Sequence, residues 1–409
     1  MSTKSLAAAA PSPGIPSYDI DPYDPAILED PEPFFSELRQ RGHLVWLPHY
    51  GIFGAGRYDV VREIFSDWRR FVSGRGVGLM DLKKEKHWRT PGLTAESDPP
   101  IHDKMRKVVA RALSARAIAN LRQQMTLHAD SLIDRLLNVE SFDAIHDLAE
   151  AFPLDIFPTA VGIGQEHRER LITYASITFN FVGPDNDLRR TAAQKGESII
   201  PWVNSRCERA AIAPSGLAAT IYVAADNGEI TESEAALLVR SLLSAGIDTT
   251  MSGIGNALYC LAHWPEQFEK LRSHANPEAA AKAAFDEGLR RLGPVTHFYR
   301  TADEDTQLGG IPVPEGSKIY CALGAANLDP SRWTDPTRYD IERNTNGHLA
   351  FGIGIHNCLG QVIARAEAET LLAAMARRVK RLELTGPARW RPNNSIRGLD
   401  TLPMRFQPR

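Results

Sequence analysis

The amino-acid sequence predicts a mainly α-helical fold with a small mixed β-sheet. Apolar residues recur at helix spacing over most of residues 97–276, with breaks at Pro153, Gly183 and Pro214. Short apolar runs bounded by turn residues, which are typical of strands, occur before residue 57 and after residue 297. The strands are therefore expected at the two ends of a helical middle.

The expected elements follow in order along the chain. Residues 1–17 contain Ala7–Ala10 followed by prolines, so we expect a disordered tail there and, because no later change in composition marks a linker, a single domain over residues 18–409. One helix is expected to begin at Arg57 and another to span residues 360–379. The expected strands are residues 44–47, 51–54, 298–302, 311–313 and 318–321, with a coil over 326–347.

A long central helix is predicted from Thr231 to Trp264. Thr231 is a favourable N-cap, and Glu234 completes a capping box. Such a length indicates a helix that crosses the whole molecule. Residues 245–250, Ala-Gly-Ile-Asp-Thr-Thr, lie near its middle, although glycine costs about 1 kcal/mol in a helix interior and threonine competes for backbone hydrogen bonds. We expect a notch in the helix at this point.

The overall charge excludes several classes of function. With 47 basic and 50 acidic residues the net charge is −3, too small to attract the whole molecule to nucleic acid or to an anionic membrane. No uncharged apolar run reaches the length needed to span a bilayer, and the 4 cysteines are too few for a disulfide framework. We therefore expect a cytoplasmic monomer with no nucleic-acid or membrane partner.

The most specific motif surrounds Cys358. Residues 351–360 read Phe-Gly-Ile-Gly-Ile-His-Asn-Cys-Leu-Gly, so glycines bracket a cysteine that directly precedes a predicted helix. A thiolate at that position is stabilised by the helix N-terminus and by backbone donors. Two other interpretations are a buried small side chain and a zinc site with His348, His356 and Cys321, although the short paired spacings typical of structural zinc are absent.

This segment resembles the haem-thiolate loop of cytochrome P450 monooxygenases, in the pattern Phe351-x-x-Gly354-x-His356-x-Cys358-x-Gly360. Two further family motifs occur in order, Glu287-x-x-Arg290 and a later Arg343. The resemblance implies the cytochrome P450 fold, with the long central helix over a haem b. It also implies that Cys358 is the iron ligand and that Phe351 and Gly352 contact the haem.

The segment Asp98-Pro99-Pro100, followed by His102 and Arg106, resembles the family segment that holds a haem propionate. Positions i and i+4 share one helix face, so both side chains can reach the same carboxylate. By the same resemblance, Arg300 and His356 make further propionate contacts.

The notch in the central helix matches the family site that binds dioxygen over the haem. Ala245 and Gly246 are expected to border the cofactor there. Asp248 and Thr249 match the family residues that act in oxygen activation, where a hydroxyl holds the bound peroxide and an acid relays solvent protons to it. The thiolate on the opposite side favours O–O bond cleavage.

The source of electrons is expected to be a separate protein. Residues 74–78, Gly-Arg-Gly-Val-Gly, lack the spacing of a nucleotide-binding loop and are expected to form a flexible surface loop that begins the pocket cover. NAD(P)H then acts only indirectly, through a ferredoxin reductase and an iron–sulfur ferredoxin. A basic docking patch for the ferredoxin, with a solvated helix face as the alternative, is predicted at Lys104, Arg106, Lys107, Arg111, Arg116 and Arg122.

Among cytochromes P450, the chain most resembles the bacterial group that demethylates para-methoxybenzoate and related aromatic acids. The pocket residues expected from this resemblance are Arg89, Phe179, Val182, Ser241, Ser244, Ala245, Val295 and Phe298. Arg89 is expected to face the substrate carboxylate. Gly92 stands where that group has a carboxylate-binding serine, which makes room for a longer acid or a neutral methoxyphenol.

We therefore predict a haem enzyme that hydroxylates or O-demethylates a small aromatic substrate, such as a para-substituted benzoate or a cinnamate-like acid. A cytochrome P450 acting on another hydrophobic molecule, a haem-binding sensor or carrier, and a peroxide-driven peroxygenase remain as alternatives. The Asp248-Thr249 pair favours the oxygen-activating enzyme, because a carrier needs no proton relay.

Overall fold

The computed structural model describes residues 14–85 and 89–409. Residues 1–13, most of the expected tail, lie outside the described residues. The chain is mainly helical, as predicted. The helices are α1 (Pro25–Glu29), α2 (Glu32–Arg41), α3 (Tyr58–Ser66), α4 (Ile101–Ala112), α5 (Ala115–Leu136), α6 (Ala151–Val161), α7 (Glu169–Asn180), α8 (Asp187–Cys207), α9 (Leu217–Asp226), α10 (Glu232–Gly246), α11 (Asp248–His263), α12 (Pro265–Ser273), α13 (Pro277–Arg291), α14 (Leu323–Asn327) and α15 (Gln361–Arg378).

The strands form small separate sheets. They are β1 (Val45–Leu47), β2 (Ile52–Ala55), β3 (Phe71–Val72), β4 (Phe142–Asp143), β5 (Phe298–Ala302), β6 (Thr306–Leu308), β7 (Ile311–Val313), β8 (Lys318–Cys321), β9 (Val379–Leu384), β10 (Arg389–Arg391), β11 (Gly398–Thr401) and β12 (Pro403–Pro408). The largest sheet has the order β1-β2-β8-β5-β3. This sheet is mixed, as predicted: β2 and β8 pair in parallel, and the other neighbouring strands of the sheet pair antiparallel.

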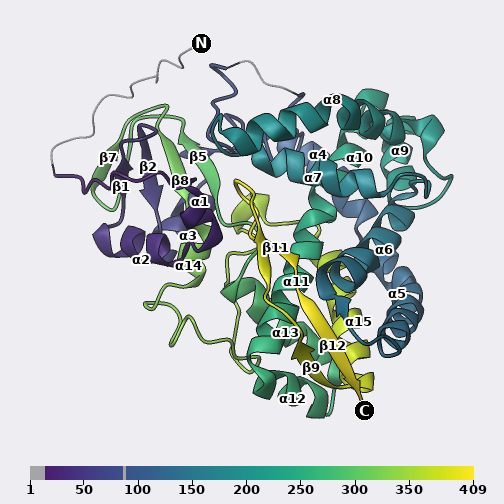
Figure 1. Cartoon of the computed structure of the whole chain (residues 1–409). Coiled ribbons are helices and arrows are strands. Elements are labelled where there is room, and N and C mark those ends of the chain that lie inside the picture. The colour runs from purple at the N-terminus through teal and green to yellow at the C-terminus, as the bar shows by residue number, and fades with distance from the viewer. Residues whose placement is uncertain (1–13, 86–88) are drawn as a thin grey trace.

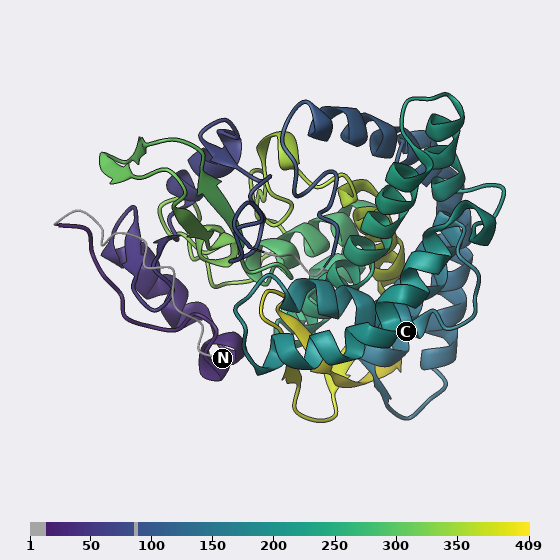
Figure 2. The ribbon, with the colours of Figure 1, turned by 90° about the horizontal axis from the view of Figure 1, so that it is seen from above.

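This mixed sheet and the helices occupy different sides of the molecule. In Figures 1 and 2 the strands β1, β2, β5 and β8 lie on one side, and the helices α5 to α10 lie on the other. Pro16 and Ser17 run beside β1, where the backbone of Trp46 donates to the carbonyl of Pro16 at 2.7 Å. Within the described part of the chain, no helix combines the length and apolar character needed to cross a bilayer.

The predicted continuous central helix is wrong at one point. Thr231 caps α10 with Glu234 in the expected capping box, but α10 ends at Gly246 and α11 begins at Asp248. Between them Ile247 has φ −100° and ψ −68°, outside ordinary helix geometry. The expected notch is therefore a complete interruption, and it presents the turn at residues 245–249 to the interior.

Helix α11 is buried along nearly its whole length and fixes the position of this turn. It packs against α13 and against a π-helical segment, Ala144–Glu150. Close approach requires small residues, because a Cβ at Gly255 would lie 2.8 Å from the side chain of Ile145. Gly253 faces Leu289 on α13 in a similar way, with 3.2 Å between the hypothetical Cβ and Cδ2.

A buried ion network joins α13 to the coil that precedes the cysteine loop. Glu287 and Arg290 form a double hydrogen bond at 2.7 and 2.8 Å, and both side chains are 0% exposed. Arg343 reaches the same carboxylate at 3.1 Å. Arg290 also donates to the carbonyl oxygens of Asn327 and Pro336. One helix turn therefore anchors several points of an otherwise irregular coil.

This network predicts a large loss of stability when one partner is removed. Arg290→Met should lower the free energy of unfolding by about 3–5 kcal/mol, because it removes the double hydrogen bond of the buried carboxylate of Glu287 and leaves Arg343 as its only cationic partner. Arg272→Met is the matched control: Arg272 forms an i,i+3 pair with the exposed Glu269, so its loss should cost about 0–1 kcal/mol. Urea denaturation measures both. Equal losses in the two variants would contradict the assigned role.

Candidate functional site

The loop before Cys358 has a backbone that only glycine accommodates easily. Gly352 and Gly354 have φ of +67° and +73°. A Cβ at Gly354 would also lie 2.7 Å from the carbonyl oxygen of Phe65. The amide of Cys358 donates to the carbonyl of Phe351 at 2.8 Å and closes the loop. The sulfur is thereby presented immediately before α15.

Of the four cysteines, Cys358 is exposed whereas the other three are buried. Its sulfur lies deep within the fold, so this accessibility is to an internal space. Burial raises the pKa of the Cys358 thiol, and the backbone amides of Gly360 and Gln361 and the charges of Arg106 and Arg365 act in the opposite direction. The expected backbone donors and basic charges are present, but they lower the pKa of the thiol by less than burial raises it. A bound metal ion would displace the thiol proton.

A cluster of basic side chains lies near the cysteine loop, with polar atoms that lack protein partners. The rings of His102 and His356 are 4.5 Å apart, and the Nε2 atoms of both are buried without a hydrogen-bond partner among the described residues. Burial lowers the pKa of His356, and the nearby charges of Arg300 and His102 act in the same direction, whereas Asp98 opposes them. This cluster fits the carboxylates of an anionic planar cofactor such as haem.

Arg300 is a further buried member of the cluster. Its Nη1 donates to the carbonyl of Tyr299 at 2.8 Å, and its guanidinium lies over the ring of Phe65. Burial lowers the pKa of Arg300 to about 10. Arg106 instead directs Nη2 to the carbonyl of Asn357 at 2.5 Å, beside the cysteine. The four expected propionate contacts are thus brought to one region, where His356 belongs to the cysteine loop and Arg106 binds its backbone.

The helix interruption brings Ala245 and Thr249 to accessible positions. The hydroxyl of Thr249 donates to the carbonyl of Ala245 at 2.6 Å, so its hydrogen is committed and its oxygen can accept. Gly246 allows the helix backbone to pack closely against Phe157, because a Cβ at this position would lie 2.4 Å from the ring of Phe157. The backbone at the interruption therefore approaches the interior closely.

Asp248 points away from this accessible surface. It is 0% exposed, and its Oδ1 pairs with Arg391 and accepts from Ser252 at 3.2 Å. Its Oδ2 is buried with no hydrogen-bond partner among the described residues. Arg391 lies on β10, far away in the sequence, and sequence reasoning did not find it.

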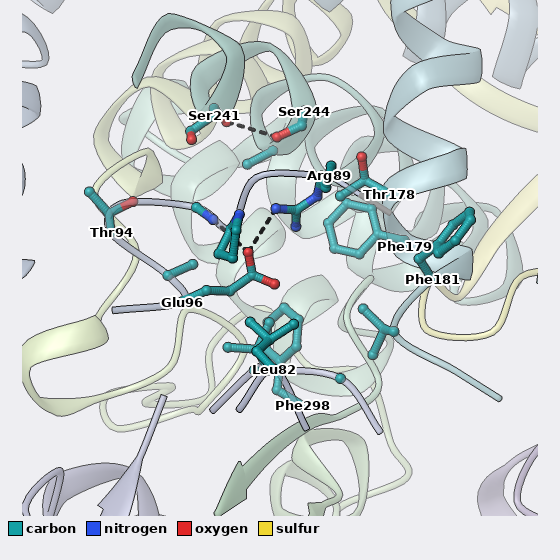
Figure 3. Close-up of a pocket in the computed structure, with 18 of the residues that line it drawn as sticks. Leu82, Arg89, Thr94, Glu96, Thr178, Phe179, Phe181, Ser241, Ser244 and Phe298 are labelled. Carbon is teal, nitrogen blue, oxygen red and sulfur yellow. Dashed lines mark hydrogen bonds and ion pairs between the residues drawn. The ribbon is translucent and has the colours of Figure 1, made fainter. Parts of the chain in front are cut away.

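A cavity lies beside the interruption and contains most of the expected substrate residues (Figure 3). Ala245 of the helix interruption and Phe298 of β5 both line it. The other expected residues that line it are Arg89, Phe179, Val182, Ser241 and Ser244. Val295 does not line this cavity; it forms a β-bridge with Ile396 and packs between two hydrophobic clusters.

Arg89 already has a carboxylate partner. Its Nη1 donates to Glu96 Oε2 at 2.8 Å, and the amide of Gly92 donates to the same oxygen at 2.6 Å. Figure 3 shows this pair at the edge of the cavity. Sequence reasoning missed Glu96 and also Arg240, which lines the cavity and donates to the carbonyl of Thr90 at 2.7 Å. Arg240 lies four residues before Ser244 on α10, so the shared helix face was the available signal.

The predicted flexible loop at residues 74–78 is wrong in one respect. Arg75 is buried and pairs with Asp81 at 2.5 Å, and the amide of Leu79 donates to the carbonyl of Val182 at 2.9 Å. These contacts fix the segment against the protein, because a buried charge-assisted pair resists opening. Gly76, Val77 and Gly78 line the cavity, as the expected cover does.

The predicted basic patch is divided by acidic partners. Arg111 pairs with Glu229 at 2.7 Å and Arg122 with Glu369 at 3.1 Å. Lys104 and Lys107 are exposed on α4. Among residues 14–85 and 89–409, no group of three or more metal-ligating side chains gathers, so the alternative zinc site lacks its ligand set.

The chain is similar to known proteins over nearly its whole length. A family model described as Cytochrome P450 matches residues 153–276 and 279–395. The chain is 46% identical over 396 residues to Cytochrome p450 CYP199A2 of Rhodopseudomonas palustris, which covers 97% of this chain and 95% of that protein. Identity to the cytochrome P450 monooxygenase PikC of Streptomyces venezuelae is 32% over 404 residues, covering 96% and 95% of the two chains.

Solved structures give the same result. The structure of CYP109Q5 from Chondromyces apiculatus matches with a TM-score of 0.80 at 29% identity and covers 96% of this chain and 99% of that one. Cytochrome P450 CREJ in complex with (4-ethylphenyl) dihydrogen phosphate matches with a TM-score of 0.84 at 25% identity, covering 95% and 99%.

The loop geometry predicts different effects of two glycine substitutions. Gly354→Ala should greatly reduce haem incorporation, because the new Cβ meets the backbone of Phe65 and requires an unfavourable positive φ. Gly360→Ala should be tolerated, since Gly360 has φ −72° and its nearest Cβ neighbour is the sulfur of Cys358 at 3.7 Å. The ratio of haem to protein absorbance measures both. Equal haem content in the two variants would refute this account of the loop.

Proposed function

This chain belongs to the cytochrome P450 family and is a haem-thiolate monooxygenase, and we propose that it hydroxylates or O-demethylates a small aromatic acid with electrons from a ferredoxin. The observation that carries the proposal is the cavity beside the helix interruption, whose lining combines aromatic side chains with a cluster of charged ones. A flat ring with one anionic end matches this combination.

The residues that would hold the haem come from separate segments. Cys358 would bind the iron, while His102, Arg106, Arg300 and His356 would contact the propionates. Phe351, Gly352, Ala245 and Gly246 would lie against the ring. When bound, the haem supplies the activation of dioxygen. The unpartnered Nε2 atoms of His102 and His356 support this assignment, because buried polar atoms without partners are costly.

Asp248 and Thr249 are proposed to manage protons at the helix interruption. The oxygen of Thr249 can accept a hydrogen bond from a group in the internal space, because its own hydrogen is donated to Ala245. Asp248 is held by Arg391 and Ser252, so it must rotate away from this pair to exchange a proton with the interior. The pair with Arg391 would thus keep the carboxyl group of Asp248 buried between turnovers.

The polar end of the cavity carries one net positive charge. Arg89 and Arg240 contribute two guanidinium groups, and Glu96 contributes one carboxylate. Burial lowers the pKa of Arg240, and the charge of Arg89 acts in the same direction, whereas Tyr174 and Glu96 oppose it. A substrate carboxylate would compensate the remaining charge. Because Arg89 is paired with Glu96, the charge that attracts the substrate belongs to the cluster rather than to Arg89 alone.

The aromatic wall of the cavity supports a ring-shaped substrate. Phe179, Phe181 and Phe298 line it together with Leu82 and Val182. Ser241 and Ser244 donate their hydroxyl hydrogens to the carbonyls of Leu237 and Ser241, so their oxygens face the cavity as acceptors. Because Gly92 has no side chain, it leaves room for a longer acid, and cinnamates as well as benzoates are candidate substrates.

A ferredoxin is proposed as the electron donor. Lys104 and Lys107 remain exposed on the helix that also carries His102 and Arg106, so an acidic partner docked there would approach the cysteine side of the haem. The three buried cysteines and the absence of any disulfide among the four support a cytoplasmic location.

The function is tested by supplying NADH, a ferredoxin and its reductase together with 4-methoxybenzoate. Each O-demethylation should consume one NADH and one dioxygen and yield 4-hydroxybenzoate, formaldehyde and water. Thr249→Ala should lower product per NADH several-fold, Thr249→Ser should retain it, and Asp248→Asn should slow NADH consumption itself. Formaldehyde and NADH are measured in parallel. No turnover of any aromatic acid by the wild-type protein would refute the proposed substrate class.

The charge cluster predicts a specific pattern of ligand affinity. Arg240→Gln should weaken binding of 4-methoxybenzoate by about 10- to 100-fold, because a charge-assisted hydrogen bond contributes about 1.5–3 kcal/mol. The neutral analogue 4-methoxytoluene should be almost unaffected. The double variant Arg89→Gln/Glu96→Gln keeps the net charge and should bind the acid nearly as the wild type does. Titrations of the haem Soret shift measure all three, and equal losses for acid and neutral ligand would contradict the model.

A further inference from the structure

One buried lysine holds the backbone wall of the substrate cavity. The ammonium of Lys318 on β8 donates to the carbonyl oxygens of Arg75 and Gly76 at 2.9 Å each and to that of Gly78 at 3.1 Å. The remaining carbonyl of this stretch, that of Val77, accepts from the amide of Tyr299 on β5 at 2.9 Å. Four consecutive carbonyls of the wall are therefore held by two neighbouring strands.

This stretch depends on these bonds because it has few side chains to anchor it. Gly76, Val77 and Gly78 line the cavity, and two of the three are glycines. A Cβ at Gly76 would lie 2.9 Å from the carbonyl of Met80, and one at Gly78 would lie 2.9 Å from that of Val182. Neither position has room for a side chain, so the wall at this point is bare backbone.

Lys318 is unusual as a buried cation. It is 7% exposed, and Asp81, whose charge acts on it, is itself paired with Arg75. The ammonium thus relies on carbonyl dipoles for its stabilisation, since a buried charge requires hydrogen bonds or a counter-charge. A lysine that only packed its aliphatic stem against the core would extend its ammonium group into the solvent.

The same strands carry residues of the active site. Phe298 at the start of β5 lines the cavity, and Arg300 on β5 belongs to the proposed propionate cluster. In the register of the sheet, Thr301 pairs with Lys318 and Arg300 with Ile319. Lys318 therefore ties the position of the cavity wall to the strand that positions both Phe298 and Arg300.

We propose that Lys318 is a positioning residue for substrate selectivity: its ammonium holds the backbone at residues 75–78 against the sheet and so limits the size of ligand that fits beside Phe298. The proposal rests on the proposed function of this cavity. It assigns to Lys318 no contact with the substrate or the haem, and its effect is transmitted through the three carbonyl groups.

The decisive variant is Lys318→Met, which keeps the apolar stem and removes the ammonium. It leaves the carbonyls of Gly76 and Gly78 without their donor, and that of Arg75 with only the amide of Leu82, so the wall should relax outward. Affinity for 4-methoxybenzoate should fall about tenfold, whereas affinity for the longer 4-methoxycinnamate should fall much less, which changes the ratio of the two dissociation constants. The reduced, CO-bound spectrum should stay that of a thiolate-bound haem.

Two controls separate this role from general stability. Lys380→Met removes an exposed lysine on β9, and Leu382→Ala destabilises the same distant strand through a buried side chain. Both should leave the ratio of the two dissociation constants at its wild-type value. An unchanged ratio in Lys318→Met, with the protein folded, would overturn the proposal.

Hydrogen exchange of the wild-type holoprotein provides a test that needs no variant. The amides of Gly76, Leu79 and Leu82 donate within or across the wall and should exchange as slowly as those of β5. Exchange at the rate of an unstructured chain would overturn the proposal even if Lys318→Met did not fold. If the wild-type protein binds neither acid, the proposed substrate class is wrong. The exchange rates still show whether the backbone of residues 75–78 is fixed against the sheet.

Discussion

Buried basic side chains with incomplete hydrogen bonding are the constraint on which the site depends. The Nε2 atoms of His102 and His356 make no hydrogen bond among the described residues, although Asp98 lies 3.7 Å from that of His356, and buried Arg300 donates to one backbone carbonyl. Each such group costs free energy in the protein alone. An anionic cofactor removes this cost, so haem binding and stability of this region are thermodynamically linked. The positive-φ glycines of the cysteine loop also favour binding of the cofactor, because they let the backbone approach a planar ligand.

The interruption between α10 and α11 connects the two functions of the site. On the α10 side, Arg240, Ser241 and Ser244 line the substrate cavity. On the α11 side, Asp248 is withdrawn into a buried pair with Arg391. A continuous helix would commit the carbonyl of Ala245 to the backbone ladder, whereas here it accepts the hydroxyl of Thr249. In the proposed function, one local departure from helix geometry therefore sets both the position of the substrate and the delivery of protons.

Sequence reasoning predicted the elements whose causes are local. The capping box at Thr231, the strand at residues 318–321 and the glycine-bracketed cysteine each follow from neighbouring residues, and all were predicted closely. The helix interruption was predicted only as a notch, because propensity identifies an unfavourable stretch but not how far it opens. The pairs of Asp248 with Arg391 and of Lys318 with residues 75–78 join segments far apart in sequence. Periodicity carries no information about such pairs, so they had to come from the structure.

The polar end of the cavity is built differently from its haem end, and this difference bears on selectivity. The proposed haem contacts come from α4, α10, β5 and the cysteine loop, each fixed by buried neighbours. The charge cluster combines Arg240 of α10 with one short segment, in which the amide of Gly92 and the side chain of Arg89 both bind Glu96. A substitution at residue 92 or 96 changes the charge or the volume offered to the substrate without touching a haem contact. Because the two ends share only α10 and β5, substrate preference can diverge between relatives while the oxygen chemistry is retained.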